Sequence, residues 1–162
     1  MIGSKMSSAL NAQINAETWS AFLYLSMSMA AAEMCWRGAA HWFRKQYEEE
    51  MQHAFKIIDY MEDQSAHVEL RPIREFPTAW ESLVRMFEEA LEHEKRVTNM
   101  IHNLCELATT EHDHATAVFL HWFVSEQVEE EETITAIIER MRLVGDDYTA
   151  LFFQDVELSE RI

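Results

Sequence analysis

The chain of 162 residues is poor in the residues that interrupt helices, with only three glycines and two prolines. Glycine and proline are the least favourable residues in a helix interior, so their scarcity favours long helices. Both prolines, Pro72 and Pro77, fall in one stretch between residues 66 and 78. We therefore expect an all-α fold in a single domain.

Cysteine is scarce as well. Cys35 and Cys105 are far apart in the sequence and neither belongs to a Cys-x-x-Cys pair, which argues against a disulfide framework. The chain also lacks a run of about 18 apolar residues, and no apolar signal core follows its first residues. The sequence predicts a soluble cytoplasmic protein.

Basic residues are few: the chain has 13 of them and 29 acidic residues, which gives a formal net charge of -16. Such a chain repels nucleic acid and anionic membrane surfaces and attracts cations. We expect neither nucleic acid nor membrane as a partner.

Hydrophobic residues make up 48% of the chain and recur in steps of three and four, the pattern of helices that bury one face. The pattern predicts helices over about residues 4–34, 38–66, 79–109, 113–144 and 147–160. The long break after the second helix has some 13 residues, which can extend to roughly 43 Å and thus cross the length of a bundle.

Particular residues are expected at the helix ends. Gly38 should end the first helix, Thr78 should open the third in a capping box with Glu81, Asp113 should cap the fourth, Gly145 should end it, and Asp146 or Asp147 should cap the fifth. The link at Gly38 is so short that the first two helices should be antiparallel.

Each long helix carries polar residues on its otherwise apolar face. They are Glu17 in the first helix, Glu50 and His53 in the second, Glu94 in the third, and Gln127 and Glu130 in the fourth. A buried carboxylate is costly unless it is paired, hydrogen-bonded or bound to a metal, and four such accidents in one chain are improbable.

These six residues lie near the middle of their helices, about 12 to 17 residues from each start, so they can meet at one level of a bundle. Carboxylates, imidazole and amide without thiolate suit iron or manganese, with zinc as a competitor. We predict a carboxylate-bridged di-metal centre. Glu17, Glu50 and His53 would hold one ion, and Glu50, Glu94 and Glu130 the other, with Gln127 as a weaker ligand or hydrogen-bond partner.

Other side chains close to this set have two readings each. Glu49, Glu126 and Glu129 form either a third, partly exposed cation site or a solvated acidic face. Tyr24 is either a core aromatic or a hydrogen-bonding neighbour of the centre.

Three of the histidines outside the predicted centre are considered with their neighbours. Glu92 and His93 fall off the inward face of the third helix and are expected to be solvated or at an interface. His112 and His114 belong to a turn that either binds metal or is simply a surface loop.

The chain resembles the bacterial non-haem ferritins along nearly its whole length. The stretches that carry the resemblance are Asn15-Ala16-Glu17 with Tyr24, Glu49-Glu50-Met51-Gln52-His53, Glu94, and residues 122–130. The resemblance implies a ferritin-like four-helix bundle with one long crossover loop between the second and third helices and a short fifth helix.

The resemblance also implies a hollow octahedral homo-oligomer of about 24 chains. Such a cage oxidises Fe(II) with dioxygen or hydrogen peroxide and stores a ferric oxy-hydroxide mineral. Ferroxidase positions of the family match Glu17, Glu50, His53, Glu94, Gln127 and Glu130, and a nearby tyrosine matches Tyr24. The extra iron site of bacterial members matches Glu49, Glu126 and Glu129, so two irons and a possible third are implied.

Some positions depart from related families. Met51 stands where haem-binding bacterioferritins carry their haem-ligating methionine, but their second Glu-x-x-His is replaced here by Gln127-x-x-Glu130, so we expect no haem. The positions that match the acidic entry channel of animal ferritins are Ala117 and Leu120, which leaves the iron entry route open.

Two other classes of function remain as alternatives. A rubrerythrin-like di-iron peroxidase would carry two helical Glu-x-x-His motifs and usually a cysteine-rich iron module. A metal-free helical scaffold would have to tolerate buried, unpaired carboxylates.

Overall fold

The computed structural model describes residues 2–145 and 147–161. Its helices are α1 (Ser4–Glu33), α2 (Arg37–Asp63), α3 (Leu83–Thr110), α4 (His114–Val144) and α5 (Tyr148–Leu158). No strand occurs among the described residues, so the all-α prediction is confirmed. Over the same residues, no helix combines the length and the apolar character that crossing a membrane requires.

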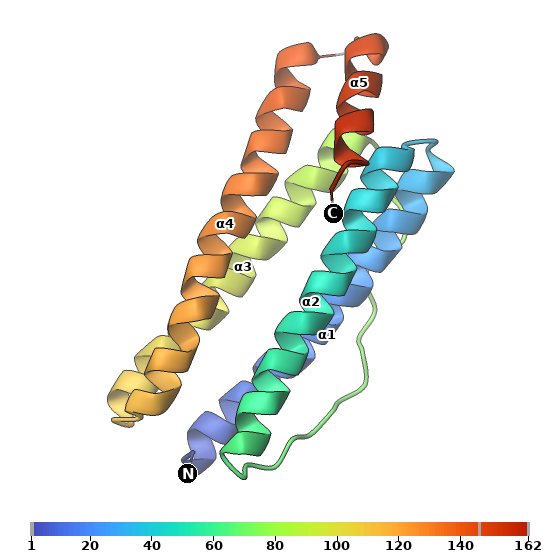
Figure 1. The fold of residues 1–162 in the computed structure, drawn as a ribbon. Coiled ribbons are helices and arrows are strands. Elements are labelled where there is room, and N and C mark those ends of the chain that lie inside the picture. Colours follow the sequence, from blue (N-terminus) through green and yellow to red (C-terminus); the bar gives the residue numbers. More distant parts are fainter. Residues whose placement is uncertain (1, 146, 162) are drawn as a thin grey trace.

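The four long helices form two antiparallel pairs, α1 with α2 and α3 with α4 (Figure 1). Residues 64–82 connect α2 to α3 by running along the bundle from one end to the other, so α2 and α3 point in the same direction (Figure 1). This is the long crossover that the resemblance implied. The short α5 packs against α2 and α4 at one end.

The crossover has no regular structure, yet asparagines of α1 bind its backbone. Asn11 accepts a hydrogen bond from the backbone N–H of Glu69 at 2.6 Å and donates one to the carbonyl of His67 at 2.9 Å. Asn15 accepts another from the N–H of Arg71 at 2.7 Å. Backbone groups outside helices need such partners, so α1 fixes the path of the loop.

The apolar core consists of two clusters that occupy the two halves of the bundle. One includes Tyr24, Phe43 and Phe87. The rings of the two phenylalanines stack with their centroids 4.6 Å apart. The other includes Leu10 and Phe123. Along every long helix, the residues predicted to hold metal lie between the two clusters.

The start of α3 differs from the prediction. Ser82, and not Thr78, is the N-cap, and its side chain accepts a hydrogen bond from the N–H of Arg85. The prediction of a capping box at Thr78 is therefore wrong. Trp80 packs against the core and its indole N–H donates to Glu89 at 2.7 Å, so the segment before Ser82 lies against α3 without continuing it.

The turn between α1 and α2 also differs, because Gly38 lies in the first turn of α2 and does not end α1. Cys35, with φ of 68°, takes the left-handed conformation in the turn. The Asp155 carboxylate of α5 accepts hydrogen bonds from the N–H groups of Gly38 at 2.9 Å and Ala39 at 2.7 Å. A Cβ at residue 38 would lie 1.5 Å from the backbone oxygen of Asp155, so glycine permits the close approach of α5.

The other helix ends follow the predictions more closely. Asp113 and Asp147 cap α4 and α5 through their side chains, and Gly145, with φ of 56°, follows α4. Asp146, the alternative cap, lies outside the described residues. The second helix ends at Asp63, three residues earlier than expected.

Replacing Gly38 by alanine should displace α5, because the added methyl group meets backbone and not a flexible side chain. We expect a loss of about 1–3 kcal/mol in unfolding free energy, or about 2–4 °C in melting temperature per kcal/mol. Gly3→Ala is the matched control, since its Cβ would meet only the Glu111 side chain at 3.6 Å. Equal melting temperatures for the two variants would contradict the close packing.

Candidate metal centre

The six predicted ligands lie together at one level of the bundle, as their positions along the helices predicted. None of their side chains is more than 6% exposed. They come from all four long helices: Glu17 from α1, Glu50 and His53 from α2, Glu94 from α3, and Gln127 and Glu130 from α4.

Glu17, Glu50 and His53 form the first group whose ligand atoms are close enough to hold one ion. These atoms all lie within 4.8 Å of one another, and His53 Nδ1 is 3.6 Å from Glu50 Oε2. Gln13, one turn before Glu17, donates to Glu17 Oε1 at 2.8 Å and so orients that carboxylate. Glu17 Oε2 and Glu50 Oε2 are buried without a hydrogen-bond partner among the described residues. A cation between them would satisfy both oxygens.

The second group differs from the predicted second ligand set. Its members are His53, Glu126 and Glu130, whose ligand atoms again lie within 4.8 Å of one another. His53 Nε2 is 3.9 Å from Glu126 Oε1, so opposite edges of one imidazole face Glu50 and Glu126. Glu126, predicted for the third site, is thus next to the centre itself.

Glu94 is engaged by neutral hydrogen-bond donors in this structure. The Tyr24 hydroxyl donates to Glu94 Oε1, and Gln127 Nε2 donates to Glu94 Oε2 at 3.1 Å. Tyr24 is therefore a hydrogen-bonding neighbour of the centre as well as a core aromatic. Gln127 has the predicted role of hydrogen-bond partner, and the ligand role of Glu94 stays a prediction.

Gln46 was not included among the predicted site residues, although it lies one turn before Glu50. Its side-chain N–H₂ donates to Glu130 Oε2 at 2.6 Å. Its spacing of four residues from Glu50 places it on the same helix face, and this was the available sequence signal.

The pKa values of Glu50, Glu94 and Glu130 are raised. Burial is the largest cause for all three acids described here, followed by repulsion from neighbouring carboxylates in the cases of Glu50 and Glu130. The pKa of Glu50 is raised well above its ordinary value, that of Glu94 to about 7, and that of Glu130 to about 8. Without a metal ion the centre therefore retains protons near neutral pH, and a divalent cation would replace them.

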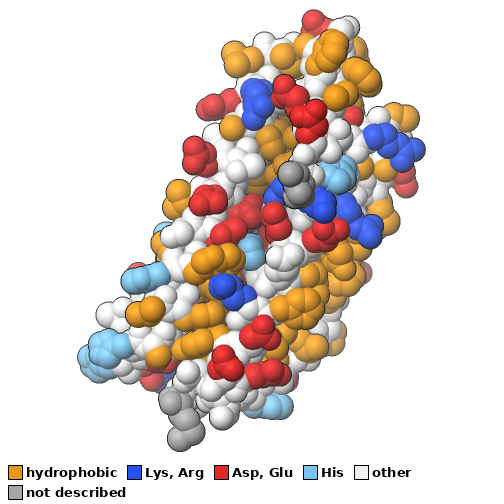
Figure 2. Space-filling model, viewed as in Figure 1, with side chains coloured by type: hydrophobic (Ala, Val, Ile, Leu, Met, Phe, Trp, Pro, Cys, Tyr) orange, Lys and Arg blue, Asp and Glu red, His pale blue; other side chains and the backbone are white. Residues whose placement is uncertain are grey.

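The three residues predicted for a third cation site are not brought together. Glu49 and Glu126 line one recess of about 280 Å³ beside His53, but Glu129 is exposed and not part of its lining. Glu49 is bound by the Arg161 guanidinium, which donates to its carboxylate. In the space-filling view, acidic side chains gather midway along the molecule between α2 and α4 (Figure 2).

The prediction for His93 is wrong, because its imidazole is buried. His93 Nε2 lies 2.7 Å from Ser20 Oγ, and the ring packs against Trp19 with centroids 5.3 Å apart. Burial lowers the pKa of His93 to about 4, with a smaller contribution from Arg96. The side chains that bury His93 belong to α1, and the apolar pattern of α3 alone does not reveal them. The Glu92 side chain is exposed, as predicted.

The remaining positions singled out in the sequence lie away from the centre or in the core. His112 lies in the turn before α4 and His114 is the first residue of α4; both are exposed, and neither belongs to a group of described side chains close enough to hold a metal ion. Met51 is half-buried. Leu120 is fully buried in the second core cluster, so it cannot line an entry channel in this conformation.

Fold and site together define an all-α bundle protein with a buried carboxylate–histidine centre. A family model described as a ferritin-like domain matches residues 7–144. The chain therefore belongs to the ferritin family.

Full-length relatives and solved structures agree with this placement. The chain is 40% identical to a bacterial non-heme ferritin of Bacteroides fragilis, covering 99% of this chain and 100% of the relative. It is 35% identical to one of Staphylococcus aureus, with 99% and 97% covered. A novel open pore ferritin from the hyperthermophilic archaeon Archaeoglobus fulgidus is 46% identical over the whole of both chains, with a TM-score of 0.99. The predicted resemblance to the bacterial non-haem ferritins and the predicted ferritin-like fold are both confirmed.

The raised pKa values of Glu94 and Glu130 predict how the metal-free protein responds to pH. The ordinary value for both is 4.5, so between about pH 4.5 and pH 8 the folded chain keeps protons that the unfolded chain releases. These groups therefore destabilise the fold as pH rises through that window. We expect the melting temperature of the metal-free protein to fall from about pH 5.5 to about pH 8.

Added Zn²⁺ should stabilise the protein more at the upper end of this window, because the carboxylates must lose their protons to bind it. Glu130→Gln, which cannot ionise, should show a shallower fall. If the melting temperature of this variant follows that of the parent at every pH, Glu130 does not cause the fall.

Proposed function

We propose that the protein is a ferroxidase that stores iron. Fe(II) would bind at the buried centre, and each ion would give up one electron to dioxygen or hydrogen peroxide, which takes up the electrons together with protons. The Fe(III) produced would be deposited as a ferric oxy-hydroxide mineral inside a cage. The observation that supports this most directly is the pair of unpartnered oxygens on Glu17 and Glu50 beside His53.

The residues have distinct parts in this proposal. Glu17, Glu50 and His53 would hold one iron, and Glu50, Glu94 and Glu130 the other, with Glu50 as the bridge. The structure groups His53 and Glu126 with Glu130, so Glu126 would receive an ion near the second position or orient His53 through its Nε2. Tyr24 and Gln127 hold Glu94 through hydrogen bonds.

A haem-binding role is less well supported. The buried pair on α4 at the level of Glu50 and His53 is Gln127 and Glu130, so this helix offers no second Glu-x-x-His. A rubrerythrin-like peroxidase would need the same motif. The curated relatives reported above are named non-heme ferritins. The cytoplasmic location stays a prediction.

Removing a ligand of the first group should slow iron oxidation without unfolding the bundle. We expect Glu50→Ala and His53→Ala to reduce the initial rate of ferric absorbance by at least about tenfold when anaerobic Fe(II) protein is exposed to air. Glu62→Ala, at an exposed position of α2 outside the predicted sites, is the matched control. Parent-like rates in both ligand variants would rule out this centre as the ferroxidase site.

We further propose that the chain assembles into a cage of about 24 copies with octahedral symmetry. Support comes from the family and from the outer face of α5, where Phe152 and Phe153 are more than half exposed. Exposed apolar patches of this kind mark protein contacts.

A solution mass measurement checks the cage directly. The expected mass is about 24 times the 19.1 kDa of one chain. Phe153→Glu, on the exposed face of α5, should shift the protein to smaller species because it places charge in the contact. A parent protein that stays monomeric or dimeric would exclude the cage.

A further inference from the structure

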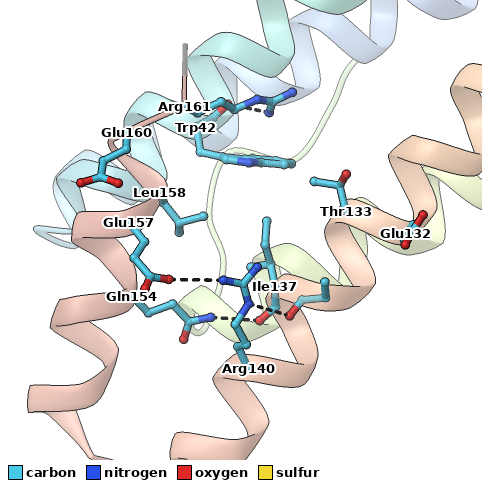
Figure 3. Close-up of a pocket in the computed structure, with 11 residues that line it drawn as sticks. Trp42, Glu132, Thr133, Ile137, Arg140, Gln154, Glu157, Leu158, Glu160 and Arg161 are labelled. Carbon is cyan, nitrogen blue, oxygen red and sulfur yellow. Dashed lines mark hydrogen bonds and ion pairs between the residues drawn. The ribbon is translucent and has the colours of Figure 1, made fainter.

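Arg161 lies three residues beyond α5, and its side chain reaches across to α2. Its guanidinium donates to Gln46 Oε1 at 2.6 Å and, with the other terminal nitrogen, to the Glu49 carboxylate. Its Cζ lies 4.5 Å from the centroid of the Trp42 ring, over which it is seen in the close-up (Figure 3). The side chain is only 21% exposed. These contacts fix one face and both terminal nitrogens of the guanidinium.

Through Gln46, this contact continues to the metal centre. The Gln46 amide accepts from Arg161 with its oxygen and donates to Glu130 Oε2 at 2.6 Å with its nitrogen. Arg161 is thus one side chain away from a predicted metal ligand. Its positive charge is also among the influences that lower the pKa of Glu130 against the larger effect of burial.

The backbone around Arg161 is held as firmly as its side chain. His41 Nε2 lies 2.8 Å from the Arg161 carbonyl oxygen, and Asp155 binds the first turn of α2. The position of the guanidinium therefore follows from the docking of α5.

Glu49 borders the recess beside His53 through which the centre faces solvent. A guanidinium bound to a carboxylate uses the same oxygens that a divalent cation would ligate. An ion that takes Glu49 Oε2 as a ligand must therefore displace Arg161, and an ion on Oε1 would lie beside the positive charge of its guanidinium.

The structure also has room for the displaced guanidinium. A cavity of about 510 Å³ lies beside Arg161 and Trp42; Glu132 and Glu160 border it, and their carboxylates are directed away from its middle (Figure 3). Gln154 Oε1, from the same lining, is buried without a hydrogen-bond partner among the described residues. A displaced guanidinium that enters this cavity would have Gln154 Oε1 as a free acceptor, while Glu157 there is already paired with Arg140.

We propose that Arg161 is a built-in competitor for the outer cation position: it occupies Glu49 in the metal-free protein and is displaced when a divalent ion binds there. The same side chain positions Glu130 through Gln46 until the exchange occurs. The inference rests on the proposed function in taking a divalent metal ion as the ligand of this recess. It assigns Arg161 a role in regulating the occupancy of the recess.

Calorimetric titration of the metal-free protein with Zn²⁺, a redox-inert divalent probe, tests the competition. Arg161→Gln keeps a hydrogen-bonding side chain but removes the charge, so the weakest class of sites should bind Zn²⁺ about five- to tenfold more tightly than in the parent. Arg161→Lys keeps the charge without the planar fork and should fall between the two. Arg140→Gln is the matched control, because Arg140 pairs with Glu157 in the same cavity and contacts neither Gln46 nor Glu49.

A double variant separates competition from a general effect on the fold. In a Glu49→Gln background the affinity gain from Arg161→Gln should vanish, because the shared carboxylate is gone. Unchanged or weaker Zn²⁺ binding in Arg161→Gln, or an equal gain in Arg140→Gln, would overturn the proposal. If Arg161→Gln does not fold, the lysine variant decides the question by the same comparison.

The two proposals fail in different ways. A parent protein that binds Zn²⁺ tightly but does not oxidise Fe(II) contradicts the ferroxidase proposal and leaves the Arg161 comparison intact. A parent that oxidises Fe(II) while Arg161→Gln leaves the weak sites unchanged contradicts only the competition.

Discussion

Burial of negative charge at the centre of an apolar bundle is the constraint on which the rest of this structure depends. Glu17, Glu50, Glu94 and Glu130 are nearly inaccessible to water, with apolar clusters on both sides of them. Leaving so many carboxylates ionised without compensation would cost several kcal/mol per charge. The chain can keep protons on them, surround them with donors or bind cations. Burial raises the pKa values of Glu50, Glu94 and Glu130, which favours the first. The structure shows donors at three of the carboxylates and unpartnered oxygens on Glu17 and Glu50 that suit a cation.

Glutamine amides carry much of this compensation. Gln13 donates to Glu17, Gln46 to Glu130 and Gln127 to Glu94. A neutral amide orients a carboxylate without cancelling its charge, so in Glu17 and Glu130 the accepting oxygen is fixed and the other is left for a cation. In Glu94 both oxygens accept hydrogen bonds, from Tyr24 and Gln127. No side chain among the described hydrogen bonds donates to Glu50, the residue proposed to bridge two ions. A bridging carboxylate needs both of its oxygens, so the missing donor suits that role.

The features that could be predicted from the sequence are those that repeat along a helix. The period of apolar residues gave the helices, and the polar residues on those faces gave the six inward-pointing side chains. It could not show which way an imidazole turns, so the grouping of His53 with Glu126 was missed. The burial of His93 against Ser20 and the contact of Arg161 with Glu49 join residues about 70 and 110 positions apart, and no local pattern encodes them.

The short helix α5 connects the fold to the centre. Eleven residues do not form a stable helix alone in water, so its contacts must hold it. Leu151 and Leu158 pack on the core. Polar contacts add to this: Asp155 binds the first turn of α2, Gln154 binds the Ile137 carbonyl, and Arg161, just beyond the helix, binds Gln46 and Glu49. The apolar outer face with Phe152 and Phe153 is left uncovered. Because the inner contacts of α5 end at carboxylates of the metal region, any ion that competes for Glu49 must also loosen part of what keeps this helix docked.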